Sequence, residues 1–321
     1  MNRKYKKYVI TLLLFFFTML GVYHAVISNS KMFYMSIEYP MWSDIREKIN
    51  QTNHESYELL CIGDSRAKAG FIPKIYDDKH HKSINLSLGG ATPIEGYYIL
   101  KKYLQNNPTP KKILLSFAPF HIQAQDTYWT RTVTFDFLSW YEYATISMDA
   151  YKLLDTTLGD ESYLEYKIIG FSYLTNTIKY PFDEKYKNNT KTWQTLQESK
   201  GHFFFGKNTK TNRPNQEAQA KDKHFVASKL IDYYLDKLLA LAKEKHVPVY
   251  WFTMPFSQLS YNLIHNNYKK EYKSYLEKKS KEYDMKILNQ LMPLANNYFG
   301  DSSHLYNGAN VVSNEIKKHL E

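Results

Sequence analysis

The stretch Leu59-Leu60-Cys61-Ile62-Gly63-Asp64-Ser65-Arg66 decides the fold. Its apolar run predicts a strand buried on both faces, and the Gly-Asp-Ser turn that follows predicts the start of a helix. A serine in this position projects its hydroxyl and its own N–H into the crevice beyond the strand, where a helix N-terminus favours negative charge. Ser65 is therefore a candidate nucleophile that needs a nearby base. The structural alternative is that Asp64 or Ser65 only caps the helix.

The rest of the chain alternates between short apolar runs and longer amphipathic segments. We expect strands at 57–62, 83–88, 111–117, 247–253 and 286–289, and helices at 92–106, 225–245, 260–284 and 307–319. The helix at 92–106 has a strong start signal, with Thr92 as N-cap, Pro93 as first residue and Glu95 as reciprocal capping partner. Helices between short apolar strands predict an α/β fold with a doubly wound parallel sheet.

Residues from 120 to about 224 interrupt this alternation. They are rich in Tyr, Trp, Asn and Thr and lack several strands of their own, so we interpret them as a long insertion within one domain that covers 57–321. In open parallel sheets, chemistry gathers at the carboxyl ends of the strands. That rule selects the segments 63–66, 89–92 and 118–121.

A second motif, Asp301-Ser302-Ser303-His304, follows the last predicted strand. The Asp301 carboxylate can reach the His304 imidazole across one turn and hold it in the tautomer that accepts a serine proton. The same spacing occurs at Asp77/His80 and Asp78/His81. Those pairs precede the second strand, at the amino-terminal edge of the sheet, and we interpret them as a solvated loop.

A third motif, Asn85-Leu86-Ser87-Leu88-Gly89-Gly90-Ala91-Thr92, ends the second strand. Glycines at a strand end let backbone N–H groups approach a reacting carbonyl and stabilise an oxyanion. A tight turn with no further role is the alternative.

The composition of the chain limits the kinds of partner that we expect. The net charge of +10 comes mostly from lysine, which favours anionic partners, but no nucleic-acid-binding signature appears and we expect no nucleic acid. The histidines lack companions at ligand spacing, so we expect no metal and no cofactor. Cys61 is the single cysteine, which excludes an intrachain disulfide and indicates a buried apolar residue.

The N-terminus predicts the compartment. Residues 1–8 carry Arg3, Lys4, Lys6 and Lys7, and residues 9–28 are mostly apolar over about one bilayer thickness. The basic tail predicts a cytoplasmic N-terminus, a single-pass anchor in the bacterial cell (inner) membrane, a juxtamembrane segment at 29–56 and a domain outside the cytoplasm. A cleaved signal peptide is the alternative, although no convincing cleavage site follows Ile27.

In order and position, the three motifs resemble the blocks of the SGNH hydrolases, also called GDSL esterases and lipases. The resemblance covers about 57–319 without the insertion. It implies that Ser65 is the nucleophile, His304 the base and Asp301 its orienting carboxylate, and that the N–H groups of Ser65 and Gly90 form the oxyanion hole.

One block departs from the family pattern. The family's third block supplies an asparagine as a further oxyanion donor, whereas this strand ends Ser116-Phe117-Ala118-Pro119-Phe120-His121. His121 is a candidate replacement donor or substrate contact, with an ordinary loop histidine as the alternative. Arg66 is a candidate contact for an anionic substrate, with an exposed arginine at a helix start as the alternative.

The anchor, the insertion and the missing asparagine make the chain resemble the envelope SGNH-like proteins of glycan acylation. These act in alginate and peptidoglycan O-acetylation and in teichoic-acid D-alanylation. The resemblance implies O-acyl transfer to an envelope glycan, beside a multi-pass membrane-bound O-acyltransferase. A plain esterase or lipase and an inactive scaffold of an envelope complex remain the alternatives.

Overall fold

A five-stranded parallel sheet forms the centre of the protein in the computed structural model. The model describes residues 3–22, 40–50, 56–135, 137–172 (side chains of 168–172 excepted), 184–207 and 222–321. The strands lie in the order β2-β1-β3-β4-β6, and all neighbours pair in parallel. Their bounds are β1 Leu59–Gly63, β2 Ser83–Asn85, β3 Lys112–Ser116, β4 Val249–Trp251 and β6 Lys286–Ile287. The predicted fold class is confirmed, and the parallel sheet fits the fold that the SGNH resemblance implies.

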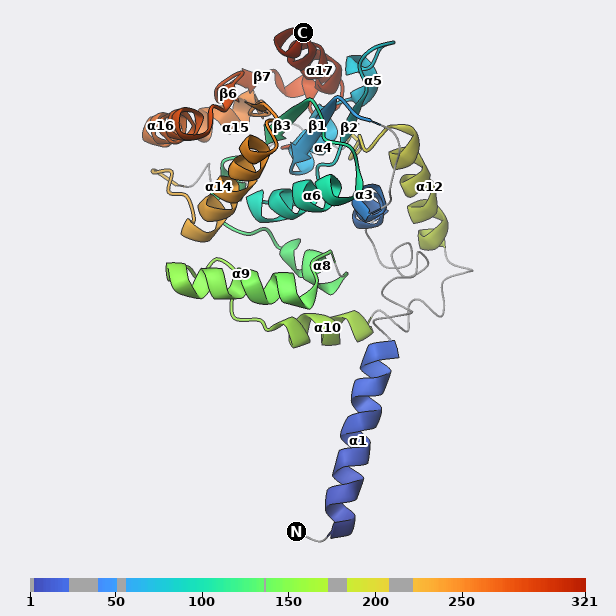
Figure 1. Cartoon of the computed structure of the whole chain (residues 1–321). Coiled ribbons are helices and arrows are strands. Elements are labelled where there is room, and N and C mark those ends of the chain that lie inside the picture. Colours follow the sequence, from blue (N-terminus) through green and yellow to red (C-terminus); the bar gives the residue numbers. More distant parts are fainter. Residues whose placement is uncertain (1–2, 23–39, 51–55, 136, 173–183, 208–221) are drawn as a thin grey trace.

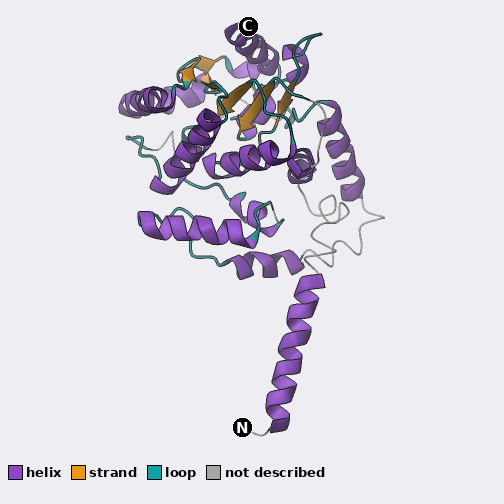
Figure 2. Ribbon diagram, in the orientation of Figure 1, coloured by secondary structure: helices purple, strands orange, loops and turns teal. Residues whose placement is uncertain are grey.

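Helices cover both faces of this sheet (Figure 2). Alternate residues of β1 point to opposite sides, so Leu59 and Cys61 belong to one buried cluster and Leu60 and Ile62 to the other. The first face of the sheet, which carries Leu59 and Cys61, packs against α4 (Ser65–Gly70), α5 (Pro73–Tyr76) and α17 (Gly308–Leu320). The second packs against α3 (Pro40–Asn50), α6 (Pro93–Asn106) and α14 (Lys229–Glu244).

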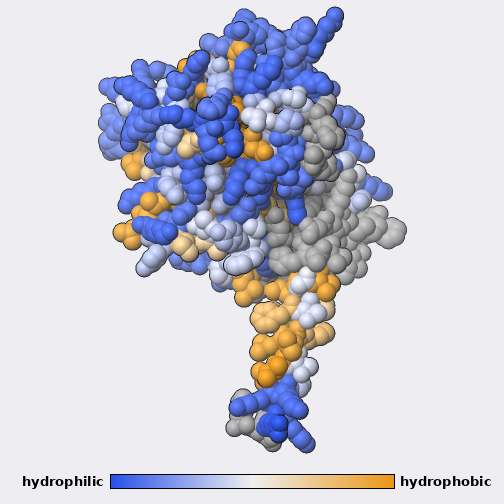
Figure 3. Space-filling view, viewed as in Figure 1, coloured by the Kyte–Doolittle hydropathy of each residue, from blue (hydrophilic) through white to orange (hydrophobic). Residues whose placement is uncertain are grey.

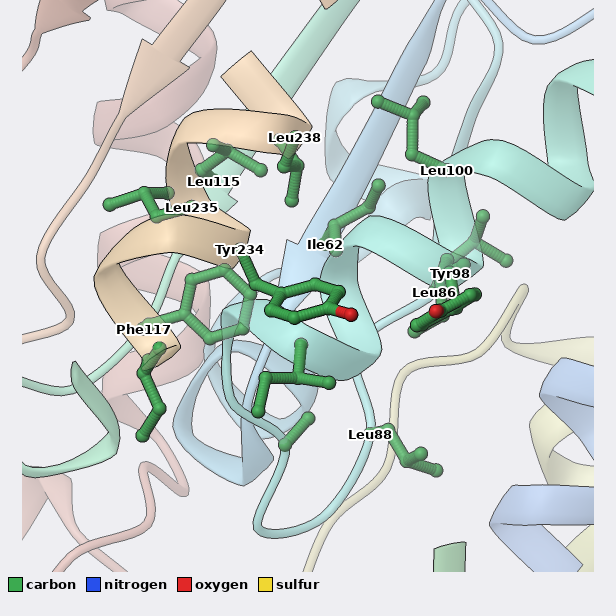
Figure 4. Close-up of a cluster of buried hydrophobic side chains, with 14 of the residues drawn as sticks. Ile62, Leu86, Leu88, Tyr98, Leu100, Leu115, Phe117, Tyr234, Leu235 and Leu238 are labelled. Carbon is green, nitrogen blue, oxygen red and sulfur yellow. The ribbon is translucent and has the colours of Figure 1, made fainter. Parts of the chain in front are cut away.

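The second face holds the larger core (Figure 4). Ile62 and Leu115 from the sheet meet Tyr98 of α6 and Tyr234 of α14, whose rings lie 6.0 Å apart. All four side chains are buried. This packing fixes α6, which begins directly after the glycine turn of the third motif.

The predicted start of α6 is confirmed. Thr92 is its N-cap, its hydroxyl accepts from the Ile94 N–H at 3.2 Å, and Glu95 accepts from the Thr92 N–H at 2.9 Å. The helix predicted at 260–284 is instead two helices, α15 (Gln258–Leu263) and α16 (Asn266–Tyr283). Ile264 takes an extended backbone between them and buries its side chain.

Two short strands were not predicted. β5 (Phe256–Ser257) and β7 (Pro293–Leu294) pair in parallel as a separate sheet. Strands of two residues carry no periodicity, so a hydrophobic pattern cannot identify them.

The segment predicted as juxtamembrane contributes a helix to the folded body. α3 packs against α6, and its Trp42 and Ile45 are fully buried. Asp44 and Lys48 of α3 form an ion pair of 2.7 Å on the side that meets 184–198, where Lys48 also donates to the Leu196 carbonyl. Among the described residues, α3 therefore belongs to the folded body, although it lies before the predicted boundary at residue 57.

The insertion is helical over its described residues. It forms α7 (Phe120–Gln123), α8 (Trp129–Thr134), α9 (Trp140–Leu153), α10 (Tyr163–Ser172) and α12 (Glu184–Glu198). In Figure 1, α8, α9 and α10 form a layer between the sheet and α1. No strand occurs in the part of the insertion that the structure describes.

The N-terminal helix α1 spans Arg3–Val22 and is long and apolar enough to cross a membrane or to serve as a signal sequence. It starts earlier than the predicted apolar segment, and positions 23–28 lie outside the described residues. Figure 3 shows an apolar shaft with a hydrophilic end at the N-terminus.

Candidate active site

A cavity of about 320 Å³ lies at the carboxyl ends of β1 and β2. It brings together five residues singled out in the sequence: Ser65, Arg66, Gly90, His121 and His304. Its other lining residues are Met41, Trp42, Gly89, Asp126, Tyr128 and Phe205. Asp301 lies directly behind His304, so every predicted site residue meets in one place.

Ser65 is the first residue of α4 and is partly exposed to the cavity. Asp64 is the N-cap and accepts the Arg66 N–H at 2.9 Å and the Ala67 N–H at 3.3 Å. The cap function therefore belongs to Asp64. Within the described residues, the Ser65 hydroxyl and N–H make no hydrogen bond, so both are available to a ligand in the cavity.

Asp64 also joins the strand ends to one another. Its second carboxylate oxygen accepts the Ala118 N–H at 2.7 Å and lies 2.7 Å from His121 Nδ1. Burial raises the pKa of Asp64, but the His121 hydrogen bond and charge and the Ala118 N–H outweigh it, so that the pKa is lowered. One ionised carboxylate thus holds the end of β1, the start of α4 and the chain after β3 in register.

His304 and Asp301 form the predicted pair. His304 Nδ1 lies 2.8 Å from Asp301 Oδ2, and Asp301 Oδ1 accepts the N–H groups of Ser303 and His304 at 2.8 and 2.7 Å. Burial raises the pKa of Asp301, but these hydrogen bonds and the charge of His304 outweigh it and bring the pKa to about 2. The carboxylate is therefore ionised at neutral pH and holds the Nδ1–H tautomer, which leaves Nε2 as the proton acceptor.

Asp78 and His81 form the same local structure at the other edge of the sheet. His81 Nδ1 lies 2.7 Å from Asp78 Oδ2, and Asp78 Oδ1 accepts the N–H groups of His80 and His81. His81 also lies 3.8 Å from Glu58, immediately before β1, and does not line the cavity. Asp77 instead accepts the Ser83 N–H at 2.7 Å. As predicted, position in the sheet separates the pairs, because the spacing alone gives both the same geometry.

Gly90 lies where a side chain would not fit. Its φ is +62°, and a Cβ there would lie 2.8 Å from Tyr128 Cβ and 3.0 Å from Asp126 Cγ. Among the described residues, the Gly90 N–H has no protein acceptor. Ser65 and Gly90, whose N–H groups have no protein acceptor among the described residues, thus both line the cavity.

His121 is a buried residue between two carboxylates, unlike an ordinary loop histidine. Its Nδ1 contacts Asp64, and its Nε2 lies 3.4 Å from Asp126 Oδ2. Both nitrogens can donate only in the imidazolium form, which suits the two flanking acids. Burial raises the pKa of Asp126, but His121 outweighs it and the pKa is lowered. This second Asp–His arrangement was not predicted, because Asp126 lies in the insertion and carries no motif.

Arg66 is buried, with 4% of its surface exposed, and its guanidinium lies 4.3 Å from the centre of the Phe256 ring. The alternative of an exposed arginine at a helix start is therefore wrong. Arg66 also lines the cavity, while its guanidinium stacks on a ring outside the lining.

Aromatic side chains that the sequence analysis missed close the cavity. Phe205 stacks on His304 with ring centres 4.2 Å apart, and Trp42 stacks on Tyr128 at 5.9 Å. They come from α3 and from the insertion, and only the high aromatic content of those segments indicated a role. The described residues contain no group of three or more His, Cys, Asp or Glu side chains placed to hold a metal ion.

Comparisons with known proteins add little. No protein-family model matches the chain, and no curated protein matches it. A solved structure from Streptococcus pneumonia, provisionally described as a platelet activating factor, aligns over 88% of this chain and 91% of its own, with a TM-score of 0.38 and 11% sequence identity. A likeness this weak carries no argument about activity.

Proposed function

We propose that this chain is a serine acyl-ester enzyme that acts outside the cytoplasm. The observation that supports it best is the shared cavity: Ser65 and His304 line one space, and Asp301 holds the His304 ring from behind at 2.8 Å. A hydroxyl, a base and an orienting carboxylate are the parts that nucleophilic acyl chemistry requires.

In the proposed reaction, Ser65 Oγ attacks the carbonyl carbon of an acyl ester while His304 Nε2 takes the hydroxyl proton. The tetrahedral intermediate then expels the alcohol, which receives that proton from His304. This leaves an acyl-Ser65 ester. An incoming hydroxyl then attacks the acyl carbon and gives its proton to His304. His304 passes that proton to Ser65 Oγ as the acyl–Oγ bond breaks, so the acyl group leaves on the new alcohol and the serine is restored.

The N–H groups of Ser65 and Gly90 supply two donors for the oxyanion. The family's third donor, an asparagine, is missing here. His121 lines the same cavity, and its Nε2 lies 3.4 Å from Asp126 Oδ2. We propose that the Nε2–H of His121 replaces the asparagine as oxyanion donor when its contact with Asp126 is broken. Arg66 is proposed to attract an anionic part of the substrate.

We further propose that the acceptor is a hydroxyl of an envelope glycan, and that a multi-pass membrane O-acyltransferase supplies the acyl group. Two features support transfer. α1 fits a membrane anchor, and Phe205 and Tyr128 of the insertion line the cavity, with Phe205 stacked on His304, so we propose that they help to keep competing water from the acyl-serine ester.

An inactive scaffold is the second candidate, because no hydrogen bond joins Ser65 and His304 among the described residues. Catalytic hydrogen bonds often form only when substrate is bound. Covalent labelling by a fluorophosphonate tests this directly. The full chain in detergent is expected to react at Ser65, and Ser65→Ala is expected to abolish the reaction.

Ser302→Ala, one residue from Asp301, is the matched control and should label like the wild type. A wild-type chain that resists the reagent would support the scaffold. Loss of surface O-acyl esters in cells carrying Ser65→Ala, with the chain still in the membrane, is expected for transfer. Hydrolysis of a model acetyl ester by the purified chain without any partner would instead support the esterase.

A further inference from the structure

Helix α9 presents large apolar side chains to solvent. Trp140, Tyr141, Met148 and Tyr151 are 64%, 69%, 56% and 80% exposed, and their spacing places them on one side of the helix. We call these four residues the aromatic face. An ordinary surface helix turns such residues toward the core and its charged residues outward. A contiguous exposed patch of this kind marks a contact surface.

The polar groups of α9 point away from this face. Glu142 pairs with Lys102 at 2.9 Å, and Asp149 accepts from the Tyr234 hydroxyl at 3.0 Å, so both acids face the protein. The hydroxyls of Thr145 and Ser147 donate to backbone carbonyls of the helix itself at 2.8 and 3.0 Å. They therefore need no water, which suits an environment of low polarity.

One charge of α9 remains exposed, that of Lys152, and it lies next to Tyr151. Tryptophan and tyrosine concentrate where a bilayer meets water, because their rings are apolar and their tips are polar. A lysine beside them is attracted to anionic lipid headgroups. The composition of the exposed side thus matches a lipid interface more closely than it matches a protein groove.

The segment between α1 and α3 also limits how far the folded body can lie from α1. Residues 23–39 join α1 to α3, and a segment of that length spans at most about 60 Å. Figure 1 shows α9 and α10 in the layer that lies toward α1. We propose that the aromatic face docks α9 into the headgroup region of the bilayer that α1 crosses. This inference rests on the proposed membrane location of α1.

Docking through α9 would place the cavity close to the membrane surface. Asp126 and Tyr128 line the cavity and immediately precede α8, which belongs to the same layer as α9. A short path from the bilayer to Ser65 suits an enzyme that receives its acyl group from a membrane partner.

Site-directed spin labelling of the full chain tests the docking. Single cysteines replace Tyr151, Phe15 in α1, and Lys278 on α16, far along the chain and exposed. The native Cys61 is fully buried and should not react with the label. Each labelled chain is placed alone in a nanodisc that contains anionic lipid, which excludes contact with a second copy or another protein.

Collisions with oxygen, which concentrates in lipid, are compared with collisions with a water-soluble nickel complex. At Phe15→Cys we expect oxygen collisions to dominate, and at Lys278→Cys we expect nickel collisions to dominate. At Tyr151→Cys we expect a ratio of oxygen to nickel collisions between these two, as for a residue in the headgroup region. If position 151 behaves like position 278 while position 15 lies in lipid, the docking is refuted and the anchor stands. That outcome would assign the aromatic face to a protein partner. If position 15 is also in water, the anchor itself is refuted.

Discussion

Replacing Gly90 by alanine separates a role in the oxyanion hole from a role in the turn alone. The new Cβ would lie 2.8 Å from Tyr128 Cβ, 2.9 Å from Tyr128 Cδ2 and 3.0 Å from Asp126 Cγ. These atoms are closer than ordinary packing allows, and Tyr128 is held by its stacking on Trp42. The glycine turn must therefore move, and the Gly90 N–H moves with it.

The magnitude follows from two separate costs. A non-glycine residue at the φ of +62° costs about 1–2 kcal/mol of stability. Displacement of one oxyanion donor costs about 3 kcal/mol of transition-state stabilisation, or about 10²- to 10³-fold in rate. Gly159 gives a matched control, since its φ is +75° and its nearest neighbour is the end of the Glu161 side chain, at 2.8 Å. Gly159→Ala should lower stability by a similar amount and leave the rate of the reaction at Ser65 unchanged.

The assay is the rate of fluorophosphonate labelling at Ser65, measured beside thermal unfolding for both variants. We expect both to unfold at lower temperature than the wild type, and Gly90→Ala alone to label about 10²- to 10³-fold more slowly. Equal labelling rates for the two folded variants would refute the assignment of Gly90 to the oxyanion hole.

Three further changes test other parts of the structure. His304→Ala should slow labelling of Ser65 by about 10⁴-fold. His81 has the same local geometry, and His81→Ala should leave the rate unchanged. Equal effects of the two changes would contradict the assignment of His304 as the base. Trp42→Ala should lower the free energy of unfolding by about 3–5 kcal/mol, because the side chain is fully buried. A loss below about 1 kcal/mol in a denaturant titration would place α3 outside the cooperative fold. Burial lowers the pKa of Lys68 to about 7, whereas the ordinary lysine pKa is about 10.4. Between these two pH values the unfolded chain binds a proton that the folded chain lacks. The free energy of unfolding should therefore rise with pH across that window. Lys68→Met should reduce this rise, and an identical pH dependence of denaturation in the two chains would contradict a neutral buried amine.

The sequence predicted the parts of the site that depend on local chemistry. A strand followed by Gly-Asp-Ser places Ser65 at a helix start, and Asp301 and His304 pair across one turn as their spacing allows. The prediction at Asp78 and His81 was equally good locally, and only the topology of the sheet separated the two pairs. Motif spacing thus predicts a dyad, while the order of strands predicts which dyad meets a nucleophile.

The walls of the cavity could not be predicted, because they depend on long-range packing. Tyr128 stacks on Trp42 of the much earlier helix α3, and Phe205 reaches His304 from a segment about a hundred residues before it. Neither contact leaves a periodic pattern in the sequence.

The same long-range packing gives the insertion its most specific connection to chemistry. Phe205 covers the candidate base, and Tyr128 and Asp126 fix the space around the Gly90 N–H. The insertion therefore shapes the base side and the oxyanion side of one cavity at once. A hydrolase gains from open access of water, whereas transfer between two alcohols requires that water be kept from the acyl-serine ester. In the function that we propose, the walls that the insertion contributes serve the second task.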